Sequence, residues 1–105
     1  MTTEEKIQNT IKATVKNYFT DAEVLLFGSR ARETSKKDSD FDILIITSKT
    51  LIPKEKLFYK AKIRKELLFS GIRTDILIQS KKEVKQKKEL PGHIIRNILN
   101  DAVPL

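Results

Sequence analysis

The sequence predicts an α/β (α+β) fold in which a small mixed sheet is flanked by helices. Three short apolar runs, residues 24–27, 41–47 and 73–79, are typical of buried strands. Amphipathic stretches with helical spacing precede, separate and follow these runs. Because one of them joins the second run to the third, we expect a crossover connection and a sheet that is at least partly parallel.

Composition limits the size and class of the molecule. A chain of 105 residues suits one domain with a modest core, so we expect residues 1–105 to form a single domain. The chain shows no apolar run long enough to span a membrane and no N-terminal signal pattern, and it has no cysteine for disulfides or thiolate metal sites. We therefore expect a cytoplasmic protein with no membrane partner.

Residues 2–20 predict the first helix. Apolar side chains recur there at helical spacing, and Thr2 with Glu5 matches a capping box. The stripe indicates packing against a core.

The first strand, residues 24–27, ends at Gly28 and Ser29. A glycine lets backbone N–H groups approach a ligand closely, and Ser29 can cap a short helix that begins at Arg30. The free amides of that helix and the guanidinium groups of Arg30 and Arg32 together suit an anion such as phosphate. An ordinary strand-to-helix turn is the alternative interpretation.

Two acids open the second strand, after a polar spacer, residues 33–39, that we expect to form an exposed loop. Asp40 and Asp42 share one face, because alternate side chains of a strand point the same way. Burying two neighbouring carboxylates is costly unless a cation lies between them, and oxygen ligands suit Mg²⁺ or Mn²⁺. The alternative is a solvated turn entering the strand, although Asp is depleted in strands.

A third acid, Asp75, opens the run of residues 73–79. If this strand pairs beside the strand of Asp42, the three acids form a cluster able to hold two metal ions about 4 Å apart. An edge-strand acid beside Arg73 explains Asp75 equally well.

A long helix is predicted between these two strands. Pro53 suits its first turn, and it runs to about Ser70, where Gly71 provides a C-terminal stop. We expect its core contacts to come from six apolar residues: Leu57, Phe58, Ala61, Leu67, Leu68 and Phe69.

Two more helices follow the third strand. Ser80 with Glu83 matches a capping box, which predicts a lysine-rich helix to about Glu89. His93 is expected to be a surface or capping residue. A last helix should pack on the sheet through apolar residues at helical spacing: Ile94, Ile95, Ile98, Leu99, Ala102 and Val103.

The net charge of +7 is concentrated in two basic runs, residues 54–65 and 81–88. Such runs attract nucleic acid or acidic proteins, but they are more often the solvated faces of amphipathic helices. No aromatic side chains are interleaved with residues 81–88 to stack on bases. Nucleic acid is therefore a secondary hypothesis.

Gly28-Ser29, a spacer of ten residues and then Asp40-Phe41-Asp42-Ile43 resemble the signature of the DNA polymerase beta-like nucleotidyltransferase superfamily. The strings GSRAR and SDFDILI look most like its minimal nucleotidyltransferase branch, the small MNT domains often encoded beside a HEPN protein. The resemblance covers nearly the whole chain. Glu33 departs from it, because many relatives have glycine there.

The resemblance implies a polymerase beta-like fold and a site for ATP or another nucleoside triphosphate. It implies that the phosphates lie on Gly28 and Ser29, with Arg30 and Arg32 stabilising charge. It further implies that Mg²⁺ or Mn²⁺ is held by three catalytic acids, Asp40, Asp42 and Asp75, the last also serving as a possible general base. An acceptor oxygen would attack the α-phosphorus, and pyrophosphate would leave.

In the branch that the chain resembles, MNT antitoxins transfer AMP to a hydroxyl side chain of a HEPN toxin. The resemblance thus implies a HEPN-type partner, with homo-oligomer formation also open. One alternative is a non-catalytic antitoxin that masks its partner. Another is a small-molecule nucleotidyltransferase, as in antibiotic resistance, which the absence of an acceptor domain disfavours.

Overall fold

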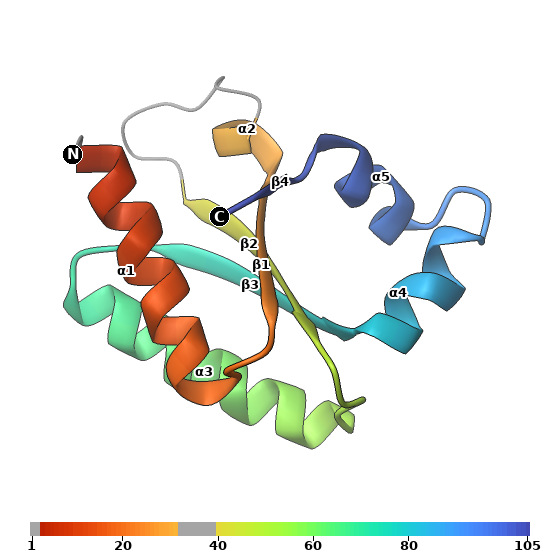
Figure 1. The fold of residues 1–105 in the computed structure, drawn as a ribbon, viewed down its shortest axis with the longest axis horizontal. Helices are drawn as coiled ribbons and strands as arrows, with labels where there is room; N and C mark the ends of the chain where they lie inside the picture. The colour runs from red at the N-terminus through yellow and green to blue at the C-terminus, as the bar shows by residue number, and fades with distance from the viewer. Residues whose placement is uncertain (1–2, 32–39) are drawn as a thin grey trace.

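The computed structural model describes residues 3–31 and 40–105, so Arg32 and the spacer 33–39 lie outside the described residues. The elements follow one another as helices and strands of unequal length (Figure 1): α1 Thr3–Tyr18, β1 Glu23–Phe27, α2 Gly28–Ala31, β2 Phe41–Thr47, α3 Pro53–Phe69, β3 Thr74–Ser80, α4 Lys81–Lys88, α5 Ile94–Asp101 and β4 Val103–Pro104.

The strands form a mixed sheet in the order β3-β2-β1-β4. β1 is antiparallel to both β2 and β4, whereas β2 and β3 are parallel. The parallel pair arises because α3 carries the chain across the sheet between them, as predicted from the long helix. The predicted fold class, a small mixed sheet flanked by helices, is confirmed.

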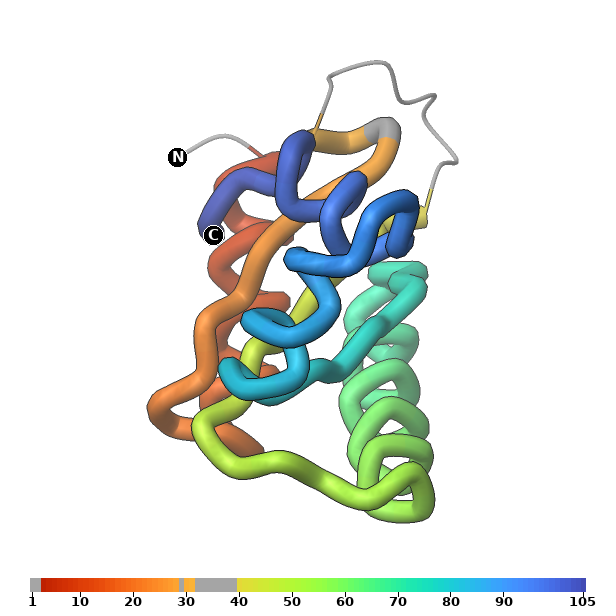
Figure 2. The backbone as a smooth tube through the Cα atoms, turned by 90° about the vertical axis from the view of Figure 1, so that its right-hand side faces the viewer, coloured from red at the N-terminus to blue at the C-terminus, as the bar shows by residue number. Residues whose placement is uncertain are grey.

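Helices cover both faces of the sheet. On one face α1 and α3 bury the larger core, which includes Ile11, Val15, Ile43, Ile63 and Leu67. On the other face α5 buries a smaller core: Leu44, Ile46, Ile95 and Ile98, with Val84 of α4 packed against it. Figure 2 shows the blue α5 beside α2 at the end of β1, where the two helices are in contact. The two faces of β2 are therefore covered by different helices.

The short helix α2 begins at Gly28 and not at Arg30, so the prediction of its start was wrong. Gly28 has a φ of 73°, in the left-handed region that glycine adopts without a steric penalty. This residue makes the sharp turn by itself, and the chain enters the helix directly from β1. The backbone of Ser29 consequently lies inside α2 and not at the predicted cap position.

The face of α3 that packs on the core also differs from the prediction. Ile63 and Leu67 are its buried residues. Five of the six residues expected to make core contacts are exposed instead: Leu57, Phe58, Ala61, Leu68 and Phe69. Apolar side chains occur around most of the circumference of this helix, so the spacing alone could not select the buried face.

The last helix is shorter than predicted. It ends at Asp101, and Val103 and Pro104 form β4, which pairs with Leu26 and Leu25 of β1. The extension of the helix to Val103 was wrong, because a residue that precedes proline is biased towards extended backbone. The N–H of Leu105 donates to the carbonyl of Val24 at 2.9 Å and holds the C-terminus on the sheet.

Local stop and start signals are confirmed where the sequence carried them. Gly71 ends α3 with a φ of 78°. At α4 the Ser80 side chain accepts from the N–H of Glu83 at 3.1 Å, and the Glu83 carboxylate accepts from the N–H of Ser80 at 2.9 Å. His93 caps α5 by accepting from the N–H of Ile95. Within the described residues, no helix is long and apolar enough to cross a membrane.

Candidate functional site

Asp42 and Asp75 lie side by side at the start of two neighbouring strands. They are register partners in the parallel pair β2–β3, so their side chains leave the same face of the sheet. Strand alternation turns Phe41 and Ile43 towards the α1–α3 core, while Leu44 joins the core under α5. Asp42 and Asp75 therefore lie on the α4–α5 face. The strand pairing that the predicted acid cluster requires is present.

Asp40 occupies the position before β2 and has a basic partner. Its Oδ1 lies 3.4 Å from Nε of Arg73, and both side chains are about half exposed. The N–H of Phe41 donates to the carbonyl of Arg73 at 2.9 Å, which holds the two segments together. Arg73 therefore forms an ion pair with Asp40, although the sequence suggested Arg73 as a neighbour of Asp75.

Gly28 brings the end of β1 against Asp42. The register pairs Phe27 with Asp42, so Gly28, the residue that follows β1, approaches the same carboxylate. A Cβ atom added to Gly28 would lie 2.2 Å from Oδ2 of Asp42 and 3.1 Å from its Cγ. Only glycine leaves room for this carboxylate. The Gly-Ser motif and the acid pair, separate in the sequence, thus form one site.

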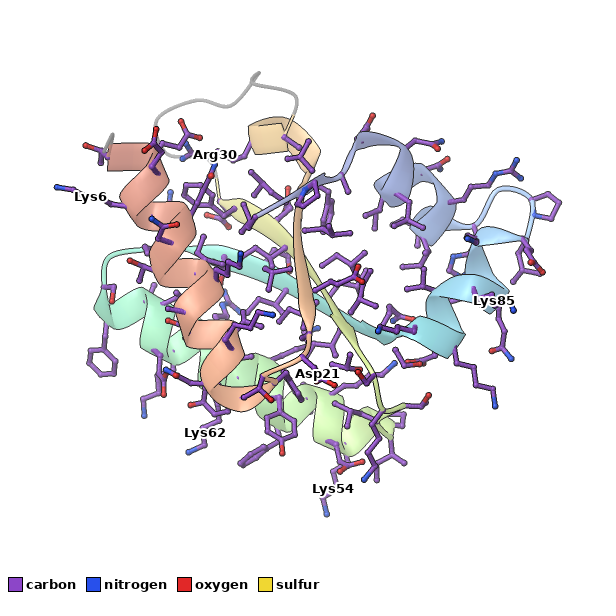
Figure 3. All side chains as sticks on the ribbon, in the orientation of Figure 1. Lys6, Asp21, Arg30, Lys54, Lys62 and Lys85 are labelled. Carbon is purple, nitrogen blue, oxygen red and sulfur yellow. The ribbon has the colours of Figure 1, made fainter. Side chains whose placement is uncertain are left out.

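Arg30 packs against an aromatic ring. Its guanidinium carbon lies 4.2 Å from the centroid of the Phe41 ring, a cation–π contact on the face that carries the α1–α3 core. It lines a surface cavity with Glu4 and Glu5 of α1, and Figure 3 shows it directed towards the start of that helix. Phe41, the aromatic residue between Asp40 and Asp42, could have indicated this contact for Arg30, but the sequence analysis did not use it.

The donor chemistry of Asp42 and Asp75 fits a hard divalent cation, because both supply carboxylate oxygens. Among the residues that the structure describes, no group of three or more His, Cys, Asp or Glu side chains is placed to hold a metal ion. The carboxylate of Asp40 is engaged by Arg73 instead.

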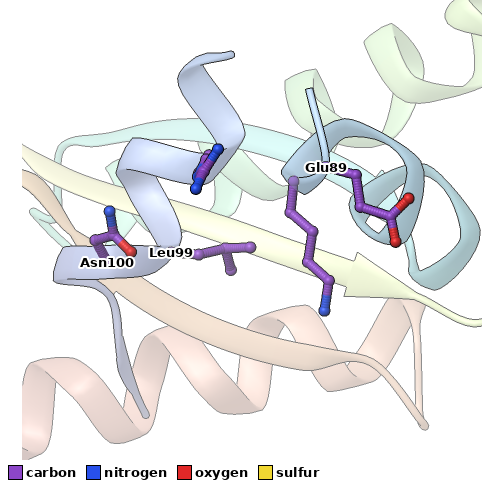
Figure 4. A pocket seen from close by; sticks show the side chains of 5 residues that line it. Glu89, Leu99 and Asn100 are labelled. Carbon is purple, nitrogen blue, oxygen red and sulfur yellow. The ribbon is translucent and has the colours of Figure 1, made fainter. Parts of the chain in front are cut away.

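A separate surface pocket lies between α4 and α5 (Figure 4). Five residues line it: Lys88, Glu89, Arg96, Leu99 and Asn100. None of the predicted site residues that the structure describes is among them, so this pocket is distinct from the carboxylate pair.

The family model of the nucleotidyltransferase domain matches residues 7–105, nearly the whole chain. The chain belongs to this nucleotidyltransferase domain family. No curated protein matches the sequence.

Solved structures share the fold of this nucleotidyltransferase domain. One is a protein provisionally assigned as a minimal nucleotidyltransferase, with 24% identity, a TM-score of 0.63 and coverage of 96% of this chain and 94% of that chain. Another belongs to a toxin–antitoxin complex with AMP-PNP, with 16% identity, a TM-score of 0.62 and coverage of 91% and 69%.

A third structure is the complex of a tri-AMPylated Shewanella oneidensis HEPN toxin with its MNT antitoxin. It shows 14% identity and a TM-score of 0.55, and the match covers 95% of this chain and 69% of that chain. At such identities the likeness establishes the fold. Together with the family match, it confirms the resemblance to minimal nucleotidyltransferases found in the sequence.

Proposed function

We propose that residues 1–105 act as one minimal nucleotidyltransferase domain in the cytoplasm, transferring AMP from ATP to a hydroxyl group of a HEPN-type partner protein as its antitoxin. The observation that carries the proposal is the pair Asp42–Asp75, side by side on parallel strands with Gly28 against it. Similar folds occur in a toxin–antitoxin complex with AMP-PNP and in one whose HEPN toxin is AMPylated. These likenesses support the choice of nucleotide and partner.

Each residue of the pair has a role in the proposed transfer. A divalent ion, Mg²⁺ or Mn²⁺, held by Asp42 and Asp75 would neutralise phosphate charge and lower the pKa of the acceptor hydroxyl. Gly28 lets the backbone approach the β- and γ-phosphates. Asp75 is the more exposed carboxylate and takes the proton from the acceptor hydroxyl. The acceptor oxygen then bonds to the α-phosphorus, and the bond to pyrophosphate breaks.

Four further residues have supporting roles in the proposal. Asp40 serves as a third ligand once its carboxylate leaves Arg73, and Ser29 contacts a phosphate. Arg30 and Arg32 stabilise negative charge near the nucleotide. Arg30 must leave the ring of Phe41 for this purpose, so we assign it a smaller share than the Asp pair.

The test is intact-mass spectrometry of the HEPN-type partner after incubation with ATP, Mg²⁺ and the wild-type domain. We expect an added AMP, and a rate at least about 100-fold lower with Asp42→Asn or Asp75→Asn, because charge neutralisation at the phosphates is lost. Glu89→Gln, an exposed acid at the end of α4, is the matched control. An unmodified partner, or equal rates for all variants, would refute the proposal.

A non-catalytic antitoxin that masks its partner is the second candidate. The ion pair between Asp40 and Arg73 favours it, because one of the three expected ligands already has a partner. In that case the Asp42→Asn variant would neutralise the toxin as well as the wild type does in a growth assay. The partner would carry no AMP in either case.

A further inference from the structure

The outer face of α3 carries exposed apolar residues near both of its ends. We call this surface the outer stripe and define it by five exposed residues: Leu57, Phe58, Ala61, Leu68 and Phe69. Phe69 is 83% exposed and Leu57 68%. At about 100° per residue, the five positions fall within roughly a third of the helix circumference, over a length of about 18 Å. Single exposed apolar residues are ordinary, but several large ones on one side of a helix favour an interaction surface.

The stripe faces away from the sheet. Ile63 and Leu67, on the opposite side of α3, are fully buried in the core. The Asp42–Asp75 pair lies beyond that core, on the face of the sheet covered by α4 and α5. A partner seated on the outer stripe would therefore leave the carboxylate pair accessible.

Lysines surround the stripe. Helical spacing places Lys54, Lys62 and Lys65 on the same side of α3, and Figure 3 shows Lys54 and Lys62 extending away from the sheet. The ammonium group of Lys62 lies 5.6 Å from the ring centroid of Phe58. Within the described part of the chain, no ion pair involves these three lysines.

The acids of α3 are engaged elsewhere. Glu55 accepts from the backbone N–H of Ile52 at the start of the helix. Glu66 accepts a hydrogen bond from the hydroxyl of Tyr18 on α1. The lysines beside the outer stripe are consequently not neutralised by ion pairs with these two acids.

We propose that the outer stripe docks an acidic amphipathic helix of a partner protein. Its apolar side chains would cover the leucines and phenylalanines, and its carboxylates would meet the lysine rim. A second copy of this chain is a poorer occupant, because it brings the same lysines and the same net charge of +7. Nucleic acid is also a less suitable occupant, because its phosphates would neutralise the lysines but leave Leu57, Leu68 and Phe69 exposed to water.

The test uses a labelled, designed helical peptide with leucine on one face and glutamate on the other. Its twin has every glutamate replaced by lysine. Fluorescence anisotropy should detect binding of the acidic peptide to the wild-type protein, weakening with salt, and at least tenfold weaker binding of its twin.

Two pairs of variants separate the contributions. Leu68→Gln with Phe69→Gln should weaken binding of the acidic peptide at least tenfold, while Leu90→Gln, equally apolar and 51% exposed in the turn after α4, should not. Lys62→Glu with Lys65→Glu should weaken it several-fold, while Lys85→Glu on α4 should not. Thermal unfolding checks that each variant remains folded.

Several results would overturn the inference. Equal binding of the two peptides, no binding of the acidic one, or equal binding by the stripe variant and Leu90→Gln would each do so. A dimer in sedimentation that the stripe variant converts to monomer would assign the surface to a second copy. RNA binding that depends on the lysines but not on Leu68 and Phe69 would assign it to nucleic acid.

Discussion

Gly28 is needed both for the turn of the backbone after β1 and for the space that the Asp42 carboxylate occupies. It has a φ of 73°, and an added Cβ would collide with the Asp42 carboxylate. Gly92 has the same φ but open space around it. Each glycine-to-alanine change costs about 1–2 kcal/mol for the left-handed backbone, and only Gly28→Ala must also displace Asp42.

We therefore expect Gly28→Ala to lower the free energy of unfolding more than Gly92→Ala does, and only Gly28→Ala to reduce nucleotide transfer. Urea unfolding and the transfer assay measure the two effects. Equal losses of stability, with transfer unaffected in both variants, would contradict the contact between Gly28 and Asp42.

For single residues, the sequence indicated which side chains belong to the candidate site better than it indicated which residues they contact. Asp42 and Asp75 stood out because Asp is rare at the start of apolar strands. Their neighbours depend on register and on tertiary packing, which no local pattern encodes. Hence Arg73 contacts Asp40, although the sequence suggested it as a neighbour of Asp75, and Arg30, predicted to bind phosphate, packs on Phe41.

Among the elements, α4 depends most on its first turn. Partial burial raises the pKa of Glu83. The hydrogen bonds from Lys56 and from the Ser80 backbone lower it by more, so its pKa lies below the ordinary value of 4.5. Lys56 Nζ lies 2.7 Å from the Glu83 carboxylate. Because the folded pKa is depressed, the stabilisation is complete above pH 4.5 and is lost as the pH falls through the folded value.

Glu83→Gln should lower the free energy of unfolding at neutral pH by about 1–2 kcal/mol. The difference from the wild type should shrink below pH 4.5, where Glu83 becomes protonated. Urea unfolding at neutral and acidic pH measures both. Glu89→Gln, at the other end of α4, should change stability by less than about 0.5 kcal/mol, and a difference for Glu83→Gln that is independent of pH would contradict the argument.

The elements with strong local signals were predicted closely. Pro53, Gly71 and the Ser80–Glu83 box fixed the ends of α3 and the start of α4 by backbone chemistry alone. The buried face of α3 and the short strand β4 were missed. A helix whose apolar residues occur on most sides does not reveal which face is buried, and a strand of two residues has no periodicity.

At the scale of the whole molecule, the order and direction of the strands bring the site residues together. β1 ends where β2 and β3 begin, so Gly28, Asp42 and Asp75 converge at one end of the mixed sheet. The crossover helix α3 makes β2 and β3 parallel and places the outer stripe on the far side of the sheet. The sequence predicted the crossover, but the order of the strands and their register are long-range properties.

The most direct test of the nucleotide site is calorimetric titration of ATP, with and without Mg²⁺, into the wild type and into Asp42→Asn with Asp75→Asn. We predict binding that requires Mg²⁺ in the wild type and a loss of at least about 100-fold in affinity in the double variant, since two charged ligands are removed. Equal affinity of the two proteins, or binding that ignores Mg²⁺, would contradict the assignment of this carboxylate pair as the nucleotide site.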